Sequence, residues 1–85
     1  MNTIKMIGNM SILCNTSEFS IDVSGLTIRE LFRKINNKFN LNDSTFLNEN
    51  FLIAINNTEI SVLNGKDSII SSGDIISIIS VSHGG

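Results

Sequence analysis

The residues of this 85-residue chain best suited to chemistry lie at its C-terminal end, Ser82-His83-Gly84-Gly85. Folding does not explain two terminal glycines, because glycine loses more conformational entropy on ordering than any other residue. Glycines do let a backbone approach another molecule closely. An enzyme could therefore thread such a tail into a narrow channel and hold it by its main-chain groups. The reactive group presented there would be the C-terminal carboxylate of Gly85.

A free carboxylate is a poor electrophile at neutral pH. Coupling to AMP would convert it to a mixed anhydride with a good leaving group, and a thiol, a persulfide or a lysine amine could then attack the carbonyl carbon of Gly85. In this scheme the chain supplies the carboxyl group and a partner enzyme uses ATP. The chain itself is then not an enzyme and binds no cofactor. The alternative interpretation is a frayed terminus without function.

Two other side chains could be reactive, the single histidine His83 and the single cysteine Cys14. His83 has no sequence neighbour that would orient its ring as a general base, so its functional interpretation is a recognition contact inside an activating enzyme. One cysteine and one histidine are too few for a metal site or an internal disulfide. We interpret Cys14 as a buried apolar residue at the end of the first strand, because no basic neighbour would lower its pKa.

Composition excludes several functions. The chain has six basic and eight acidic residues, a net charge of −2, whereas nucleic-acid binding requires a basic surplus to neutralise phosphates. No apolar run approaches the roughly 20 residues that a membrane-spanning helix needs. The length corresponds to one domain. We expect a cytoplasmic protein that contacts neither nucleic acid nor membrane directly.

The N-terminal half predicts a hairpin followed by a helix. Residues 3–13 are rich in apolar side chains, and residues 18–23 alternate polar and apolar side chains, as half-buried strands do. A turn near residues 8–9 or 15–17 would join them. Thr27 and Glu30 have the spacing of a capping box. The apolar residues that follow recur at helical spacing and form one stripe: Ile28, Leu31, Phe32, Ile35 and Phe39.

The C-terminal half predicts a loop over residues 40–50, a buried central strand over 51–55 and a last strand over 75–81. Between these strands we expect a short edge strand or turn over residues 58–63 and three turns, at Asn56-Asn57, Asn64-Gly65 and Ser71-Ser72-Gly73-Asp74. This element order predicts an α+β fold of the β-grasp, or ubiquitin-like, type. Four to five strands would form a mixed sheet with one main helix packed on one face and the last strand beside the first. The domain would span residues 1–81 and a flexible tail residues 82–85.

The last thirty residues also carry a family resemblance. Segments 55–60, 64–67, 72–77 and 80–85 are similar to the central I-N-[DN]-T-[DE] turn, the G-x-x-D segment, the [DS]-G-D-I-I-S segment and the S-T-L-H-G-G ending of the ubiquitin-related modifier family. The chain departs from that ending at Val81-Ser82, and the first fifty residues match only by pattern. His83 before the glycines distinguishes this ending from those of the molybdopterin synthase small subunit and the thiamine sulfur carrier, which share the fold.

The resemblance implies that Gly85 is adenylated by a dedicated activating enzyme and converted to a thiocarboxylate by rhodanese-type sulfur transfer. The sulfur would pass through a separate tRNA thiolase complex to the wobble uridine of certain transfer RNAs. The same activated tail would also become attached to lysines of target proteins. His83 and Gly84 would then be recognised together with Gly85 as the tail enters the activating enzyme.

The last strand suggests a second contact with the activating enzyme. Since side chains alternate along a strand, Ile76 and Ile78 would face the helix while Ile79 and Val81 lie on the open face of the sheet. Ile79 and Val81 are either ordinary scattered apolar surface or a docking face for the activating enzyme.

Two competing functions remain open at this point. The chain could be the small sulfur-carrier subunit of molybdopterin synthase, whose tail inserts into a large catalytic subunit. It could also be a non-covalent ubiquitin-like interaction domain with an accidental Gly-Gly ending.

Overall fold

The computed structural model describes residues 1–42 and 51–80. The strands are β1 (Asn2–Ile7), β2 (Glu18–Ile21), β3 (Phe51–Ile55), β4 (Thr58–Glu59) and β5 (Ile75–Ser80). The helices are α1 (Asn9–Leu13) and α2 (Ile28–Phe39), and two 3-10 turns are η1 (Ile60–Val62) and η2 (Gly65–Asp67).

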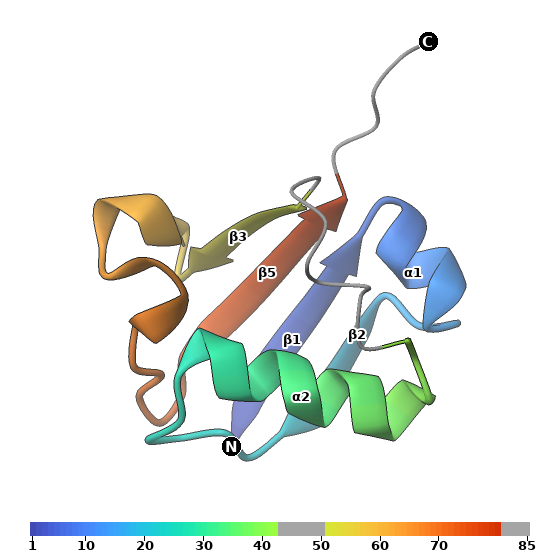
Figure 1. The fold of residues 1–85 in the computed structure, drawn as a ribbon, viewed down its shortest axis with the longest axis horizontal. Coiled ribbons are helices and arrows are strands. Elements are labelled where there is room, and N and C mark those ends of the chain that lie inside the picture. The colour runs from blue at the N-terminus through green and yellow to red at the C-terminus, as the bar shows by residue number, and fades with distance from the viewer. Residues whose placement is uncertain (43–50, 81–85) are drawn as a thin grey trace, which may run out of the picture.

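The five strands form one mixed sheet in the order β2-β1-β5-β3-β4. The first and last strands run parallel in its centre, and the other neighbours are antiparallel. Helix α2 crosses one face of this sheet (Figure 1). The predicted β-grasp fold is therefore confirmed, including the N-terminal hairpin and the pairing of the last strand with the first.

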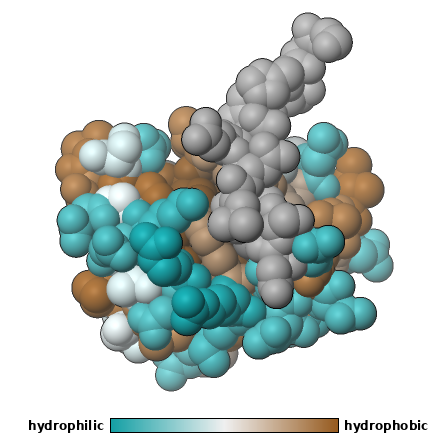
Figure 2. All heavy atoms as spheres, in the orientation of Figure 1, coloured by the Kyte–Doolittle hydropathy of each residue, from teal (hydrophilic) through white to brown (hydrophobic). Residues whose placement is uncertain are grey.

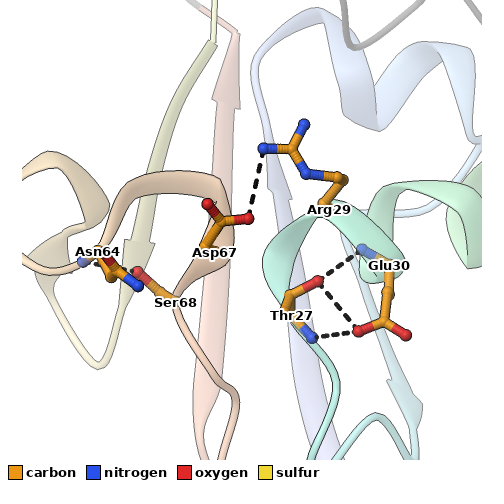
Figure 3. Close-up of polar contacts among 6 residues, drawn as sticks. All are labelled: Thr27, Arg29, Glu30, Asn64, Asp67 and Ser68. Carbon is orange, nitrogen blue, oxygen red and sulfur yellow. Dashed lines mark hydrogen bonds and ion pairs between the residues drawn. The ribbon is translucent and has the colours of Figure 1, made fainter.

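Helix α2 begins where the sequence predicts. The Thr27 side chain accepts a hydrogen bond from the Glu30 backbone N–H at 3.2 Å, and the Glu30 carboxylate accepts one from the Thr27 backbone N–H at 3.1 Å (Figure 3). The capping box satisfies two donors that the first turn of a helix leaves unpaired. The helix ends at Phe39, and the capping residue Asn40 adopts a left-handed conformation (φ 55°) that stops the helical repeat.

The core lies between α2 and the two central strands. The apolar side chains that α2 buries belong to the predicted stripe, of which only Phe39 is partly buried. They pack with apolar side chains of β1 and β5, and the set is Ile28, Leu31, Phe32, Ile35, Ile4, Met6, Ile76 and Ile78. Each fully buried aliphatic side chain of this kind stabilises the fold by about 1.5–3 kcal/mol. This burial fixes which face of β5 is turned toward the helix.

The prediction of an extended segment through Leu13 is wrong. Strand β1 ends at Ile7, Gly8 has φ +82°, and residues 9–13 form α1. Cys14 lies at the C-terminal cap of α1 instead of at a strand end, and it is buried, as expected of a structural cysteine. The reason is a pair of long-range contacts. The Met10 side chain is buried in the core, and the hydroxyl group of Ser80 in β5 accepts a hydrogen bond from the Met10 backbone N–H.

Two further features differ from the prediction, the end of β2 and the burial of β3. Strand β2 ends at Ile21, so Val23 is buried beyond the strand and not within it. Leu52 lies on the open face of the sheet and is exposed, so β3 is not fully buried. The segment predicted as a short edge strand or turn consists of the two-residue edge strand β4 followed by η1.

The turns fix the start of β5. Asn56 and Asn57 both have positive φ (50° and 72°) and form the predicted tight turn between β3 and β4. The Asn56 side chain accepts the Ile75 backbone N–H at 2.8 Å and donates to the Asp74 carboxylate at 2.7 Å. Asp74 is therefore a turn residue, as the sequence predicts. Its other oxygen accepts the Ser71 backbone N–H at 2.8 Å.

Candidate functional site

The candidate site is the edge of the sheet where β5 ends. Strand β5 is hydrogen-bonded on both sides, by β1 and β3, so its direction is rigidly fixed. Because β1 and β5 are parallel, their C-terminal ends lie at the same edge, where α1 begins (Figure 1). Ser80 is the last residue of β5, five residues before Gly85. The predicted tail residues His83, Gly84 and Gly85 lie outside the described residues, as does Val81.

Ser80 is tied to the start of α1. Its hydroxyl oxygen accepts the Met10 backbone N–H at 3.0 Å. The residue at the usual capping position of α1, Gly8, has no side chain to do this, so Ser80 caps the helix from across the fold. A Cβ atom on Gly8 would lie only 3.0 Å from the Ser80 carbonyl oxygen. Sequence reasoning missed this contact, since nothing in the sequence links positions seventy residues apart.

The open face of the sheet carries an apolar row at the same edge. Ile79 is half-buried on the face opposite Ile76 and Ile78, as the alternation predicts. The strand register places Ile7 on one side of Ile79 and Leu52 on the other. Ile7 and Leu52 are 45% and 42% exposed. We call Ile7, Ile79 and Leu52 the tail-side row. Of these three residues the sequence predicted only Ile79, together with Val81, because the pattern of one strand does not reveal its neighbours' register.

The other residues with possible chemistry are structural in the part of the chain that the structure describes. Burial raises the pKa of the Cys14 thiol, which disfavours the reactive thiolate. Arg29 forms an exposed ion pair with Asp67 at 3.4 Å (Figure 3), and polar residues cover the outward face of α2 (Figure 2). Such a solvated pair contributes little stability.

Residues 1–42 and 51–80 contain neither a candidate metal site nor a candidate membrane-spanning helix. No group of three or more His, Cys, Asp or Glu side chains there could hold a metal ion. No helix there is long and apolar enough to cross a membrane.

The fold and this sheet edge define the class of protein first. A β-grasp domain whose central last strand leads toward a Gly-Gly ending is built as a ubiquitin-like carrier. The chain belongs to the ThiS family, whose family model matches residues 10–85. It is a small sulfur carrier or ubiquitin-like modifier, and carriers of this family are not themselves catalysts. They work with E1-like activating enzymes.

Solved structures agree on the fold. The small archaeal modifier protein 1 of Methanosarcina acetivorans is 18% identical with a TM-score of 0.78, covering 99% of this chain and 95% of its own. Urm1 of Trypanosoma brucei is 20% identical with a TM-score of 0.78, covering 99% and 94%. Urm1 of Sulfolobus solfataricus is 26% identical with a TM-score of 0.68, covering 93% and 99%. A search of the curated proteins found no match.

Proposed function

We propose that this chain carries sulfur as a thiocarboxylate on Gly85 and delivers it for 2-thiolation of the wobble uridine of transfer RNA. The same activated tail would also be joined to lysines of target proteins. The observation that carries the proposal is the family match, which runs through the Gly-Gly ending to residue 85. The central position of β5 supports the proposal, because hydrogen bonds to β1 and β3 on both sides hold the strand that leads to the tail in a fixed position.

The chemistry proposed for Gly85 needs two partner activities. The carboxylate attacks ATP, forming an acyl-adenylate and releasing pyrophosphate. A persulfide of the rhodanese type then attacks the carbonyl carbon, AMP leaves, and a thiol cleaves the resulting acyl disulfide to free the thiocarboxylate. This chain contributes the carboxyl group and its presentation, with His83 and Gly84 recognised beside it.

The tail-side row is the proposed docking face for the activating enzyme, together with Val81. Ile79→Asp would place a charge in the middle of the row, so we expect weaker binding of the enzyme with an unchanged thermal midpoint. Ile75→Asp is the matched control, because Ile75 lies on the same strand and face at its far end. Equal loss of affinity in both variants would contradict the assignment of this edge.

The carrier chemistry is tested by intact mass spectrometry. The protein is purified from its own cells and measured before and after incubation with ATP, a sulfur donor and cell extract. We expect a gain equal to replacement of one oxygen by sulfur on the peptide ending in Gly85, and no gain in a variant lacking Gly84 and Gly85. If the native chain ends at Gly85 and gains no sulfur, the proposal is wrong and a non-covalent interaction domain is favoured.

The recipient of the sulfur is tested in cells that lack the gene. We expect loss of 2-thiolated wobble uridine from their transfer RNA, restored by the intact chain and not by one lacking the two glycines. Normal thiolation of transfer RNA together with loss of the activity of molybdenum-cofactor enzymes would instead assign the chain to molybdopterin synthase.

A further inference from the structure

The short distance from β5 to the tail end limits where a partner can sit. Gly85 follows Ser80 by five residues, and an extended chain spans at most roughly 3.3–3.6 Å per residue, so the reacting carboxyl group lies within about 18 Å of Ser80. An enzyme that holds Gly85 beside its nucleotide must therefore lie close to the sheet edge where β5 ends. Side chains exposed at that edge are within reach of the enzyme surface.

Helix α1 stands at that edge and presents two large apolar side chains. Ile12 is 78% exposed and Leu13 is 56% exposed. The helix carries no acidic residue in its first turn and no basic residue in its last. In Figure 2 the side of the molecule where α1 lies shows hydrophobic surface interspersed with hydrophilic residues, whereas the surface over α2 is mostly hydrophilic. A single exposed apolar residue is ordinary, but an adjacent, uncharged pair at the edge where β5 ends favours a contact surface.

Helix α1 is also held in place relative to the start of the tail. The Met10 side chain is buried in the core, and the Met10 backbone N–H donates to the Ser80 hydroxyl group at 3.0 Å. The Gly8 backbone packs closely against Ser80, since a Cβ atom on Gly8 would lie 3.0 Å from the Ser80 carbonyl oxygen. The position of Ile12 and Leu13 is thereby fixed with respect to Ser80. A partner that binds α1 places the tail at a defined distance from its active site.

We propose that α1 is a docking element for the E1-like activating enzyme, with Ile12 and Leu13 entering an apolar surface beside the channel for the tail. The inference rests on the proposed function and adds a second contact, separate from the tail-side row. A second copy of this chain is a weaker candidate for the occupant. Two side chains supply far less than the roughly 800 Å² per partner of a stable interface, whereas the enzyme gains the tail and the sheet edge as well.

The test is the double variant Ile12→Ser/Leu13→Ser in an ATP–pyrophosphate exchange assay with the E1-like activating enzyme of the same organism. We expect the KM for the carrier to rise about tenfold with kcat nearly unchanged, as for loss of binding contacts made before the chemical step. The matched control is Val62→Ser/Leu63→Ser. Val62 and Leu63 are 75% and 49% exposed. Val62 lies in η1 and Leu63 follows it, beyond the β3–β4 side of the sheet and far from α1 (Figure 1).

An unchanged KM in the Ile12/Leu13 variant, or an equal rise in the control, overturns the inference while leaving the proposed function in place. The same conclusion follows if the native carrier is a dimer in sedimentation and the α1 variant dissociates it without changing KM. If the wild-type chain supports no exchange at all, the proposed function fails and the inference fails with it.

A second variant tests the role of Ser80 as a positioning residue. Ser80→Ala removes the hydroxyl group that holds α1, so the Ile12/Leu13 substitutions should raise KM less in that background than in the wild type. Contacts that share one rigid element are expected to be non-additive in this way. Fully additive effects on KM, with both proteins folded by their thermal melts, would contradict the anchoring of α1 to the start of the tail.

Discussion

Replacing Gly8 with alanine should damage the fold more than the same change at other glycines. Gly8 has φ +82° and ψ −146°, a backbone conformation that is essentially restricted to glycine. A Cβ atom there would also lie 3.0 Å from the Ser80 carbonyl oxygen and 3.2 Å from the Ser80 Cβ. The unfavourable backbone conformation is a property of residue 8 alone, whereas the close contact joins the start of α1 to the end of β5.

Two other glycines separate these costs. Gly25 and Gly73 have φ of +86° and +82°, and a Cβ atom on either would meet nothing within 4 Å. In these controls alanine introduces only the conformational strain, about 1–3 kcal/mol. At Gly8 the crowding of backbone atoms adds about 1–3 kcal/mol, a typical cost of overpacking. Gly8→Ala should therefore lower the free energy of unfolding by about 2–6 kcal/mol, a large part of the 5–15 kcal/mol usual for a domain.

Urea unfolding followed by circular dichroism measures this difference, provided that the transition is two-state. In NMR spectra of the folded Gly8→Ala protein, the amide signals of Met10 and Ser80 should shift, while the two control substitutions should leave these signals unchanged. A Gly8→Ala cost within about 0.5 kcal/mol of the controls, the usual error of additivity, would refute the close contact. The anchoring of α1 to β5 would then lose its main support.

Four further predictions concern single side chains. Asn2→Ala should lower the free energy of unfolding by about 2–3 kcal/mol in urea titrations, because the buried amide accepts the Val23 backbone N–H at 3.0 Å and donates to carbonyl groups of the turn before β5. Thr27→Ala should cost about 1 kcal/mol in the same assay. The hydrogen bonds from the Thr27 backbone and side chain hold the Glu30 pKa below its ordinary value of 4.5. The stability that the ionised Glu30 contributes is therefore present above pH 4.5 and lost as the pH falls through the folded pKa. Glu30→Gln should flatten that part of the curve of stability against pH. Cys14 should react slowly with iodoacetamide in the native protein and rapidly in urea, since burial raises its pKa.

Local signals were sufficient for the main helix and the sheet centre. The capping box of Thr27 and Glu30 and the apolar stripe of α2 act within one segment, so their spacing alone predicts the helix and its buried face. The long apolar run of β5 and its place at the end of the element order predict a central strand beside β1. These features were predictable because the interactions that stabilise them are already present in the local pattern.

Helix α1 was not predictable in the same way. Five residues are too few for a stable isolated helix, so its stability comes from tertiary contacts. These are the burial of Met10 and the hydrogen bond to Ser80, seventy residues away. The apolar residues Ile12 and Leu13 made the segment look like a continuation of the strand, although both are exposed. A sequence pattern does not distinguish apolar residues that build a core from those that form a surface.

The candidate site was predictable to the same limited extent. Alternation along β5 places Ile79 on the open face, as the structure confirms, but Ile7 and Leu52 join it only through the register of three strands. The roles of His83, Gly84 and Gly85 remain predictions from the sequence and the family, since these residues lie outside the described part of the chain.

The pairing of β1 with β5 has a consequence for how such carriers are told apart. Glycines at the end of a tail carry no side chains, so carriers that share a Gly-Gly ending present nearly the same group to every activating enzyme. Discrimination must then come from surface that the enzyme covers while it holds the tail. Parallel pairing brings the end of β1, and with it α1, to the edge from which the tail starts. Of the apolar surface described here, Ile12 and Leu13 of α1 and the tail-side row are therefore within reach of the enzyme, and these side chains can differ between carriers without changing the reactive group.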